Sequence, residues 1–299
     1  MMKSSRAIGL LLLGIFLLFQ SPATAQVEEN LQRYTEANGK GYIQPLVNGF
    51  GASMNRGWYQ SGKVSSVGLK IRLSLSAMLA PVPDEDKTFM ATTEGVFHPK
   101  QTAEVATIVG SEKSTTVVGT GGTEYAFPGG LDLSMTGFAV PQLTVGSFMG
   151  TEASVRYFVA ELGDSEIGNL ELVGFGIQHS LSQYLLLSPV DFSIGLFWQS
   201  VTLGEDLFEF KTLHFGAQAS RPFGPLILYG GAGFDNSSAA INYTFTDGNT
   251  TTVLDYDLDG DNGLQITAGL GLNFILLHLN GDVTFGSRTV YTLGISLGL

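Results

Sequence analysis

The residues of this chain with the clearest chemical potential lie in one acidic stretch near its C-terminus. Four carboxylates occupy alternate positions there: Asp255, Asp257, Asp259 and Asp261. With Gly260 in the sixth position, this spacing is typical of the first half of a calcium-binding loop. The twelfth position, where such loops carry a bidentate glutamate, is Ile266. Two interpretations stay open, a calcium site and a solvated acidic loop, and the missing glutamate favours the second.

A second set of candidates lies on the polar faces of segments that alternate apolar and polar residues. The set consists of Lys70, Arg72, Glu152, Arg156 and Phe197. In a membrane β-barrel this face would line the lumen, where charged side chains must pair or meet water. One interpretation is a selectivity or ligand-binding patch. The other, which we favour, is a network of charge pairs that fills a narrow lumen, because small barrels pack their interiors with side chains.

Other kinds of chemistry have little support in the sequence. None of the four histidines lies three or four residues from another, and no G-x-S-x-G elbow or cysteine is present. We therefore expect no enzyme activity and, calcium apart, no cofactor; a membrane-embedded hydrolase is the weakest alternative. The net charge of −12 also disfavours a nucleic-acid partner.

The elements that must position these residues are β-strands of period two. In residues 264–274, 277–285 and 291–299 aliphatic and aromatic residues alternate with small or polar ones. Similar alternation runs through residues 67–79 and 190–199. The pattern predicts an all-β fold, an antiparallel transmembrane β-barrel of about 12 strands (10–14), counting roughly 10 residues per spanning strand plus turns.

The N-terminal region predicts export and leaves one structural question open. Residues 1–25 combine Lys3 and Arg6 with a short apolar run and a small-residue cleavage site, which is typical of a secretory signal peptide. We divide the chain into this signal peptide and a barrel over residues 26–299, whose net charge is about −14. Residues 42–58 form either a plug or the first strand, and residues 98–130 look loop-like.

The connections between the predicted strands indicate an orientation. If the last strand ends in the periplasm, the connections near residues 161–169, 204–209, 247–263 and 287 lie outside the cell, and three of these four are acidic. Those near residues 221–225 and 275 are short, as periplasmic turns usually are.

Several short motifs carry a resemblance to known proteins. They are Gly49-Phe50-Gly51, Asn55-Arg56-Gly57-Trp58, Gly150-Thr151-Glu152 with Arg156-Tyr157, Gly174-Phe175-Gly176 with His179, Pro189-Val190-Asp191 and Tyr229-Gly230-Gly231. On these residues the chain resembles a family of outer-membrane barrel proteins of diderm bacteria that look distantly like FadL-like long-chain fatty-acid transporters. The resemblance implies a plugged barrel with a greasy internal path. The asparagine-proline-alanine plug motif of the transporters is absent here.

Together these observations give an expected function and location. We expect a protein of the cell outer membrane that binds or passes small, hydrophobic molecules. A structural or interaction barrel without an open pore is the alternative, and a secreted soluble β-protein is a third. The expected partners are outer-membrane lipid, a small hydrophobic ligand and the outer-membrane barrel assembly machinery, since the C-terminal strand resembles its recognition signal.

Overall fold

The computed structural model describes most of the chain after the predicted signal peptide. The described residues are 30, 34–65, 68–161, 169–185, 188–204, 208–247 and 250–298, and the side chains of 161 and 243–254 are not among them. Residues 1–25 lie outside this set, so the signal-peptide prediction stays a prediction.

Ten long antiparallel strands close into a barrel. They are β1 (Lys70–Pro81), β6 (Met135–Phe148), β7 (Thr151–Glu161), β8 (Asn169–Ser180), β9 (Asp191–Leu203), β10 (Phe208–Phe223), β11 (Leu226–Asp247), β13 (Gly263–Phe274), β14 (Leu277–Phe285) and β15 (Val290–Gly298). Each strand pairs with the next in this order, and β15 closes the circle on β1, with Leu79 opposite Tyr291. One further strand, β12 (Thr250–Asp259), pairs with the far half of β11.

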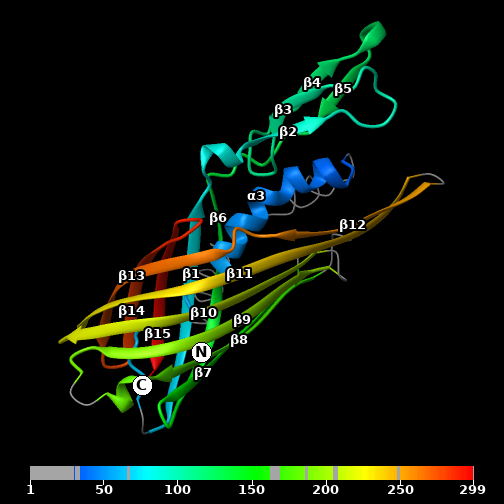
Figure 1. Cartoon of the computed structure of the whole chain (residues 1–299). Helices are drawn as coiled ribbons and strands as arrows, with labels where there is room; N and C mark the ends of the chain where they lie inside the picture. The colour runs from blue at the N-terminus through cyan, green and yellow to red at the C-terminus, as the bar shows by residue number, and fades with distance from the viewer. Residues whose placement is uncertain are drawn as a thin grey trace, which may run out of the picture.

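The ten strands of the barrel are fewer than the expected number of about 12 and lie at the lower limit of the expected range of 10–14. The expected number came from dividing the mature chain into strands and turns, but two parts of the chain do not belong to the barrel wall. One part forms the N-terminal segment before β1, and the other forms the long excursion between β1 and β6 (Figure 1).

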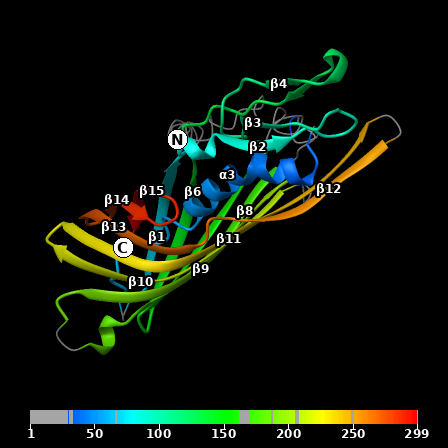
Figure 2. The same cartoon turned by 45° about the horizontal axis from the view of Figure 1, so that its top comes forward.

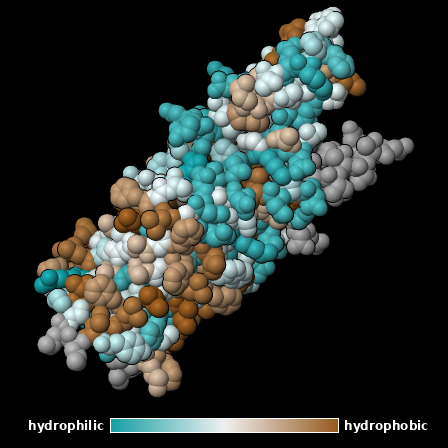
Figure 3. All heavy atoms as spheres, viewed as in Figure 1, coloured by the Kyte–Doolittle hydropathy of each residue, from teal (hydrophilic) through white to brown (hydrophobic). Residues whose placement is uncertain are grey.

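The alternating pattern determines which side of the wall each residue faces. On β13, Leu264, Ile266 and Leu270 are more than half exposed, whereas Gln265 and Thr267 between them are buried. The apolar residues thus cover the outside of the barrel and the polar ones fill its inside, the reverse of a water-soluble protein. Figure 3 shows this apolar surface gathered over the barrel half of the molecule.

Exposed aromatic residues form two rows around the outer surface. One row lies at the short-turn end of the strands: Phe148, Phe192, Phe223 and Phe274. The other lies part-way up the strands: Tyr157, Phe175, Trp198, Phe215, Phe234, Phe285 and Tyr291. About seven residues separate the rows along a strand, or roughly 20 Å at ~3.3 Å per residue. The rows resemble the aromatic girdles that flank the apolar band of outer-membrane barrels.

Beyond the second row the chain becomes polar and continues as an extension at one end. There β7 to β11 run on together past the ends of β13 to β15, and β12 pairs with the end of β11 (Figure 1). The excursion between β1 and β6 begins with the 3-10 turn η2 (Asp84–Asp86) and forms two small hairpins. They pair β2 (Thr88–Thr92) with β3 (Thr102–Ala106), and β4 (Thr115–Val118) with β5 (Glu124–Phe127), around the turn η3 (Thr120–Gly122).

The loop-like interpretation of residues 98–130 is thus only partly right. The short strands β3, β4 and β5 fall within this range. At the opposite end of the barrel the connections are short, apart from residues 181–190 between β8 and β9, which contain the 3-10 turn η4 (Ser182–Tyr184).

The N-terminal segment forms a helix, α3 (Glu36–Met54), that lies against the inner side of the extension (Figures 1 and 2). Its intrinsic helix propensity is low, because it contains four glycines and Pro45. Tertiary packing stabilises it instead. Tyr42, Ile43 and Val47 are buried in an apolar cluster with Phe210 and other residues of the strands and hairpins. Among the described helices none is both long and apolar enough to cross a membrane.

Candidate functional site

After α3 the chain continues through the barrel and so answers the question of plug or first strand. We call residues 34–65 the plug. In its lower part Gln142 Nε2 of β6 donates to the carbonyl of Trp58 over 3.1 Å, and Gln178 Nε2 of β8 donates to that of Ser61 over 2.9 Å. The hydroxyls of Ser61 and Ser220, on β10, are 2.9 Å apart. The plug is therefore held by polar side chains from several sides of the lumen.

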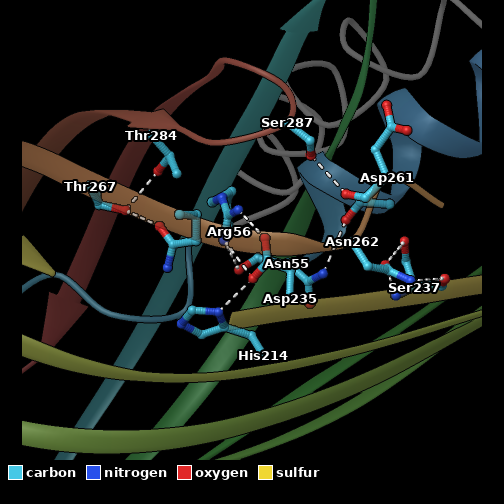
Figure 4. Close-up of polar contacts among 12 residues, drawn as sticks. Asn55, Arg56, His214, Asp235, Ser237, Asp261, Asn262, Thr267, Thr284 and Ser287 are labelled. Carbon is cyan, nitrogen blue, oxygen red and sulfur yellow. Dashed lines mark hydrogen bonds and ion pairs between the residues drawn. The ribbon is translucent and has the colours of Figure 1, made fainter. Parts of the chain in front are cut away.

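The strongest polar contact of the plug is made by Arg56 (Figure 4). Its guanidinium forms a two-pronged ion pair with Asp235 of β11, in which Nη1 lies 3.2 Å from Oδ1 and Nη2 contacts Oδ2. His214 of β10 donates from Nδ1 to the same Oδ1 over 2.7 Å. All three side chains are at least nine-tenths buried. A buried pair with this geometry stays favourable only while both partners are present.

A second arginine, Arg156 of β7, is fully buried and meets three neutral oxygens. Nε donates to Gln142 Oε1 over 3.0 Å, Nη1 to Gln199 Oε1 over 3.1 Å and Nη2 to the backbone oxygen of Arg56 over 2.9 Å. Its guanidinium carbon lies 3.6 Å from the ring centroid of Trp58, a cation–π contact. The wall and the plug together thus provide the hydrogen-bond acceptors of the Arg156 guanidinium.

A third polar cluster lies on the wall near β14. Tyr229 of β11 donates its hydroxyl to Asp282 Oδ2 over 2.7 Å, and Asn280 Nδ2 donates to the hydroxyl of Tyr229 over 3.3 Å. Gly269 on the strand between them leaves room for this contact, since a Cβ there would overlap the Tyr229 ring and Asp282. The charge of Arg56 also acts on Asp282.

Aromatic rings of the plug and the wall pack on one another inside the lumen. Phe197 stacks on Trp58 and His214 at centroid distances of 5.2 and 5.8 Å, and Tyr59 packs on Phe197 in a tilted arrangement at 6.3 Å. Gly174 faces this group, where a Cβ would lie 2.9 Å from the Trp58 ring. The small residue is therefore what lets the plug fit against β8.

The predicted lumen residues take different places in the structure. Arg156 and Phe197 are buried inside the barrel. Arg72 and Glu152 come together near the short-turn end with 3.6 Å between Nη2 and Oε1. Lys70 is exposed at that rim, close enough for its charge to act on Glu152. The structure thus brings four of these residues into the lumen and leaves Lys70 at its edge.

The predicted calcium ligands do not converge. Asp255, Asp257 and Asp259 lie along the exposed face of β12, while Tyr256 and Leu258 between them are buried in the cluster around α3. Asp261 accepts a hydrogen bond from Arg288 Nε over 2.8 Å. In the described part of the chain no three His, Cys, Asp or Glu side chains are grouped to hold a metal. The alternation that suggested a calcium loop is therefore the period of a strand.

Sequence reasoning missed the partners of the plug. Arg56 entered only as part of a motif, His214 was expected on the inner face without a partner, and Asp235 and Asp282 were not singled out as site residues. A signal was present: extending the alternation of residues 226–234 by one step puts Asp235 on the same face as Tyr229 and so inside the barrel. The pairing with Arg56 joins residues 179 positions apart, and no local pattern indicates such a contact.

The wall, its inverted polarity and the segment that fills it define a plugged β-barrel. The chain belongs to DUF6588, a family of unknown function, whose model matches residues 2–299. A resemblance specific to the long-chain fatty-acid transporters is not shown by this match.

Solved structures of outer-membrane proteins resemble this chain at low sequence identity. No curated protein matches the chain. Among solved structures it is similar to the loop L8 deletion mutant of OmpT, an outer membrane protein of Vibrio cholerae, with 10% identity, TM-score 0.28, 79% of this chain and 100% of that chain covered. It is also similar to Ail, the attachment invasion locus protein of Yersinia pestis, with 10% identity, TM-score 0.27, 78% of this chain and 100% of that chain covered. A third similar structure is the Pseudomonas putida toluene transporter TodX, with 11% identity, TM-score 0.30, 85% of this chain and 71% of that chain covered.

Proposed function

We propose that this protein is an outer-membrane β-barrel that passes small molecules when its plug moves out of the lumen. The observation that carries the proposal is how the plug is held. Within the barrel, polar side chains of the wall hold the plug through hydrogen bonds and, among the described residues, one ion pair, such as Ser61 to Ser220 and Arg56 to Asp235. These polar contacts can be exchanged for contacts with water. The plug also packs the rings of Trp58 and Tyr59 on Phe197.

The outer surface supports the membrane location. Large apolar side chains are exposed around the barrel, and a soluble secreted protein would not leave so extended an apolar band in water. The polar extension with the long connections would lie outside the cell and the short turns in the periplasm, as loop lengths in outer-membrane barrels suggest.

The lining of the lumen argues for water-soluble cargo. Many buried inward-facing residues carry hydroxyl or amide groups, including Ser74, Ser76, Gln142, Thr144, Ser154, Gln178, Ser193, Gln199, Thr212, Gln218, Ser220 and Gln265. The rings of Trp58 and Phe197 pack on each other. We therefore favour small polar solutes over the hydrophobic molecules that the sequence suggested.

The absence of native cysteine allows a direct test of plug movement. The double variant S61C/S220C, purified in detergent and inserted in planar bilayers, would form a disulfide that ties plug to wall. T144C/S154C is a matched control, because those hydroxyls are 2.8 Å apart but both belong to the wall. We expect oxidation to abolish the conductance of the first variant, reduction to restore it and the control to conduct in both states.

A closed barrel that acts through its outer extension is the second candidate. The bidentate Arg56–Asp235 pair favours it, since both charges are buried. The variant R56A separates the two functions. We expect it to conduct more than the wild type, because it releases the plug. If neither wild type nor R56A conducts while both show the heat-dependent gel mobility of a folded barrel, plug-controlled passage is wrong and the closed barrel is favoured.

A further inference from the structure

The two carboxylates inside the described lumen that face the plug lie on one side of the barrel. Asp235 belongs to β11 and Asp282 to β14, and only β13 separates these strands. Arg156 lies on β7, three strands beyond the neighbouring β10 in the other direction around the barrel. The wall formed by β11 and β14 therefore carries two carboxylates and faces Arg156 across the lumen, whereas Glu152, which shares β7 with Arg156, is paired with Arg72 near the short-turn end.

The plug supplies the guanidinium that balances this negative wall. Arg56 forms the ion pair with Asp235, and its charge also acts on Asp282. Within the described residues Asp282 makes no ion pair of its own and is held by the Tyr229 hydroxyl. When the plug leaves, Arg56 leaves with it, and the wall keeps both carboxylates.

A neighbouring amide adds an independent observation. Asn280, two residues from Asp282 on the same face of β14, is 92% buried, and its Oδ1 has no hydrogen-bond donor. Gly294 faces this oxygen from β15, and a Cβ there would overlap it. The wall thus presents an amide oxygen beside a carboxylate, and both are oxygen ligands that favour cations over anions.

We propose that the opened lumen selects cations over anions, and that Asp235 and Asp282 are the residues that set this preference. Arg56 is then a built-in cationic occupant of the wall that a soluble cation replaces. The inference rests on the proposed function and names the class of solute, small cations. The physical reason for the selectivity is general: a channel wall that carries charge of one sign raises the local concentration of ions of the opposite sign.

The test is the reversal potential of bilayer currents in a gradient of potassium chloride. R56A provides the open barrel, and it is compared with R56A/D235N and R56A/D282N. R56A/D257N is the matched control, since Asp257 is an exposed carboxylate on β12 outside the lumen. Should R56A fail to show folded-barrel gel mobility, the wild-type openings are analysed with the three single variants D235N, D282N and D257N.

We expect a potassium-to-chloride permeability ratio several-fold above one in R56A. It should fall towards one in each lumen variant and stay unchanged in the control. Currents that persist but prefer chloride, or whose preference is the same in all variants, would overturn cation selection and leave plug-controlled passage intact. No current in any folded variant would instead overturn the proposed function and cation selection with it.

Discussion

The guanidinium of Arg56 pairs with the carboxylate of Asp235 inside the barrel, and the backbone oxygen of the same arginine accepts a hydrogen bond from Arg156 on another strand of the wall. One plug residue thus joins strands β11 and β7. The Arg56 side chain neutralises the buried carboxylate of Asp235, and its backbone oxygen accepts a hydrogen bond from the buried guanidinium of Arg156. Moving the plug would therefore change the electrostatics of the lumen.

Removing one partner of the buried pair should destabilise the protein strongly. D235A leaves Arg56 buried and uncompensated, and we expect a loss of about 3–5 kcal/mol in the free energy of unfolding. Urea unfolding in detergent micelles measures this. The double variant R56M/D235A should recover part of the loss, because no unpaired charge remains. A D235A protein as stable as the wild type would show that the pair is absent in solution.

Arg156 should contribute to stability and to closure together. R156A removes the donor to two glutamines and to the plug backbone. We expect a loss of about 2–4 kcal/mol, since hydrogen bonds from a charged group contribute about 1.5–3 kcal/mol and an unpaired buried acceptor costs more. Unfolding measurements combined with bilayer recordings should show lower stability and higher conductance. Higher conductance without any loss of stability would favour a pure selectivity role instead.

A methyl group placed between plug and wall should prevent the plug from seating. G174A would put its Cβ 2.9 Å from the Trp58 ring, whereas at Gly271, also on the inner face, the nearest atom is 3.6 Å away. We expect G174A to lose about 1–3 kcal/mol through overpacking and G271A to stay near the wild type. Thermal unfolding of the two variants gives the comparison. Equal effects would mean that the plug does not pack against β8.

The docking of α3 should weaken at alkaline pH through Tyr42. Its hydroxyl donates to the carbonyl of Gly129 over 2.9 Å in a buried site, and burial raises the pKa of Tyr42 from 10.0 to about 12. Because the folded pKa lies above the unfolded one, this stabilisation is complete below pH 10 and is lost as the pH rises through about 12. The difference in 295 nm absorbance between wild type and Y42F should show that midpoint. A midpoint near 10 would contradict the buried position.

The wall could be predicted from the sequence because its pattern is local. Each strand alternates apolar and polar residues, so Leu264 and Gln265 show their sides of the barrel without any knowledge of partners. The helix could not be predicted, since residues rich in glycine with Pro45 have low helix propensity and are stabilised by distant contacts such as that of Tyr42 with Gly129. Likewise Arg156 could be placed inside the barrel, but its partners could not be predicted, because two are glutamines on other strands and the third is the backbone of Arg56 in the plug.

The acidic stretch shows how one pattern can support two interpretations. Carboxylates at alternate positions suit both a calcium loop and the exposed face of a strand. The deciding information lies in the residues between them, because Tyr256 and Leu258 pack on the cluster around α3. Only the tertiary structure shows that contact.

The two tryptophans permit the most direct test of a membrane barrel with a filled lumen. Trp198 is on the outer face, 37% exposed and stacked on Phe175, whereas Trp58 is inside, 4% exposed beneath Arg156. The variants W58F and W198F each leave one of them, and their fluorescence is measured in bilayers of brominated lipid. We predict strong quenching of Trp198 and little of Trp58. Quenching of Trp58 as strong as that of Trp198, or no quenching of Trp198, would contradict the plugged membrane barrel.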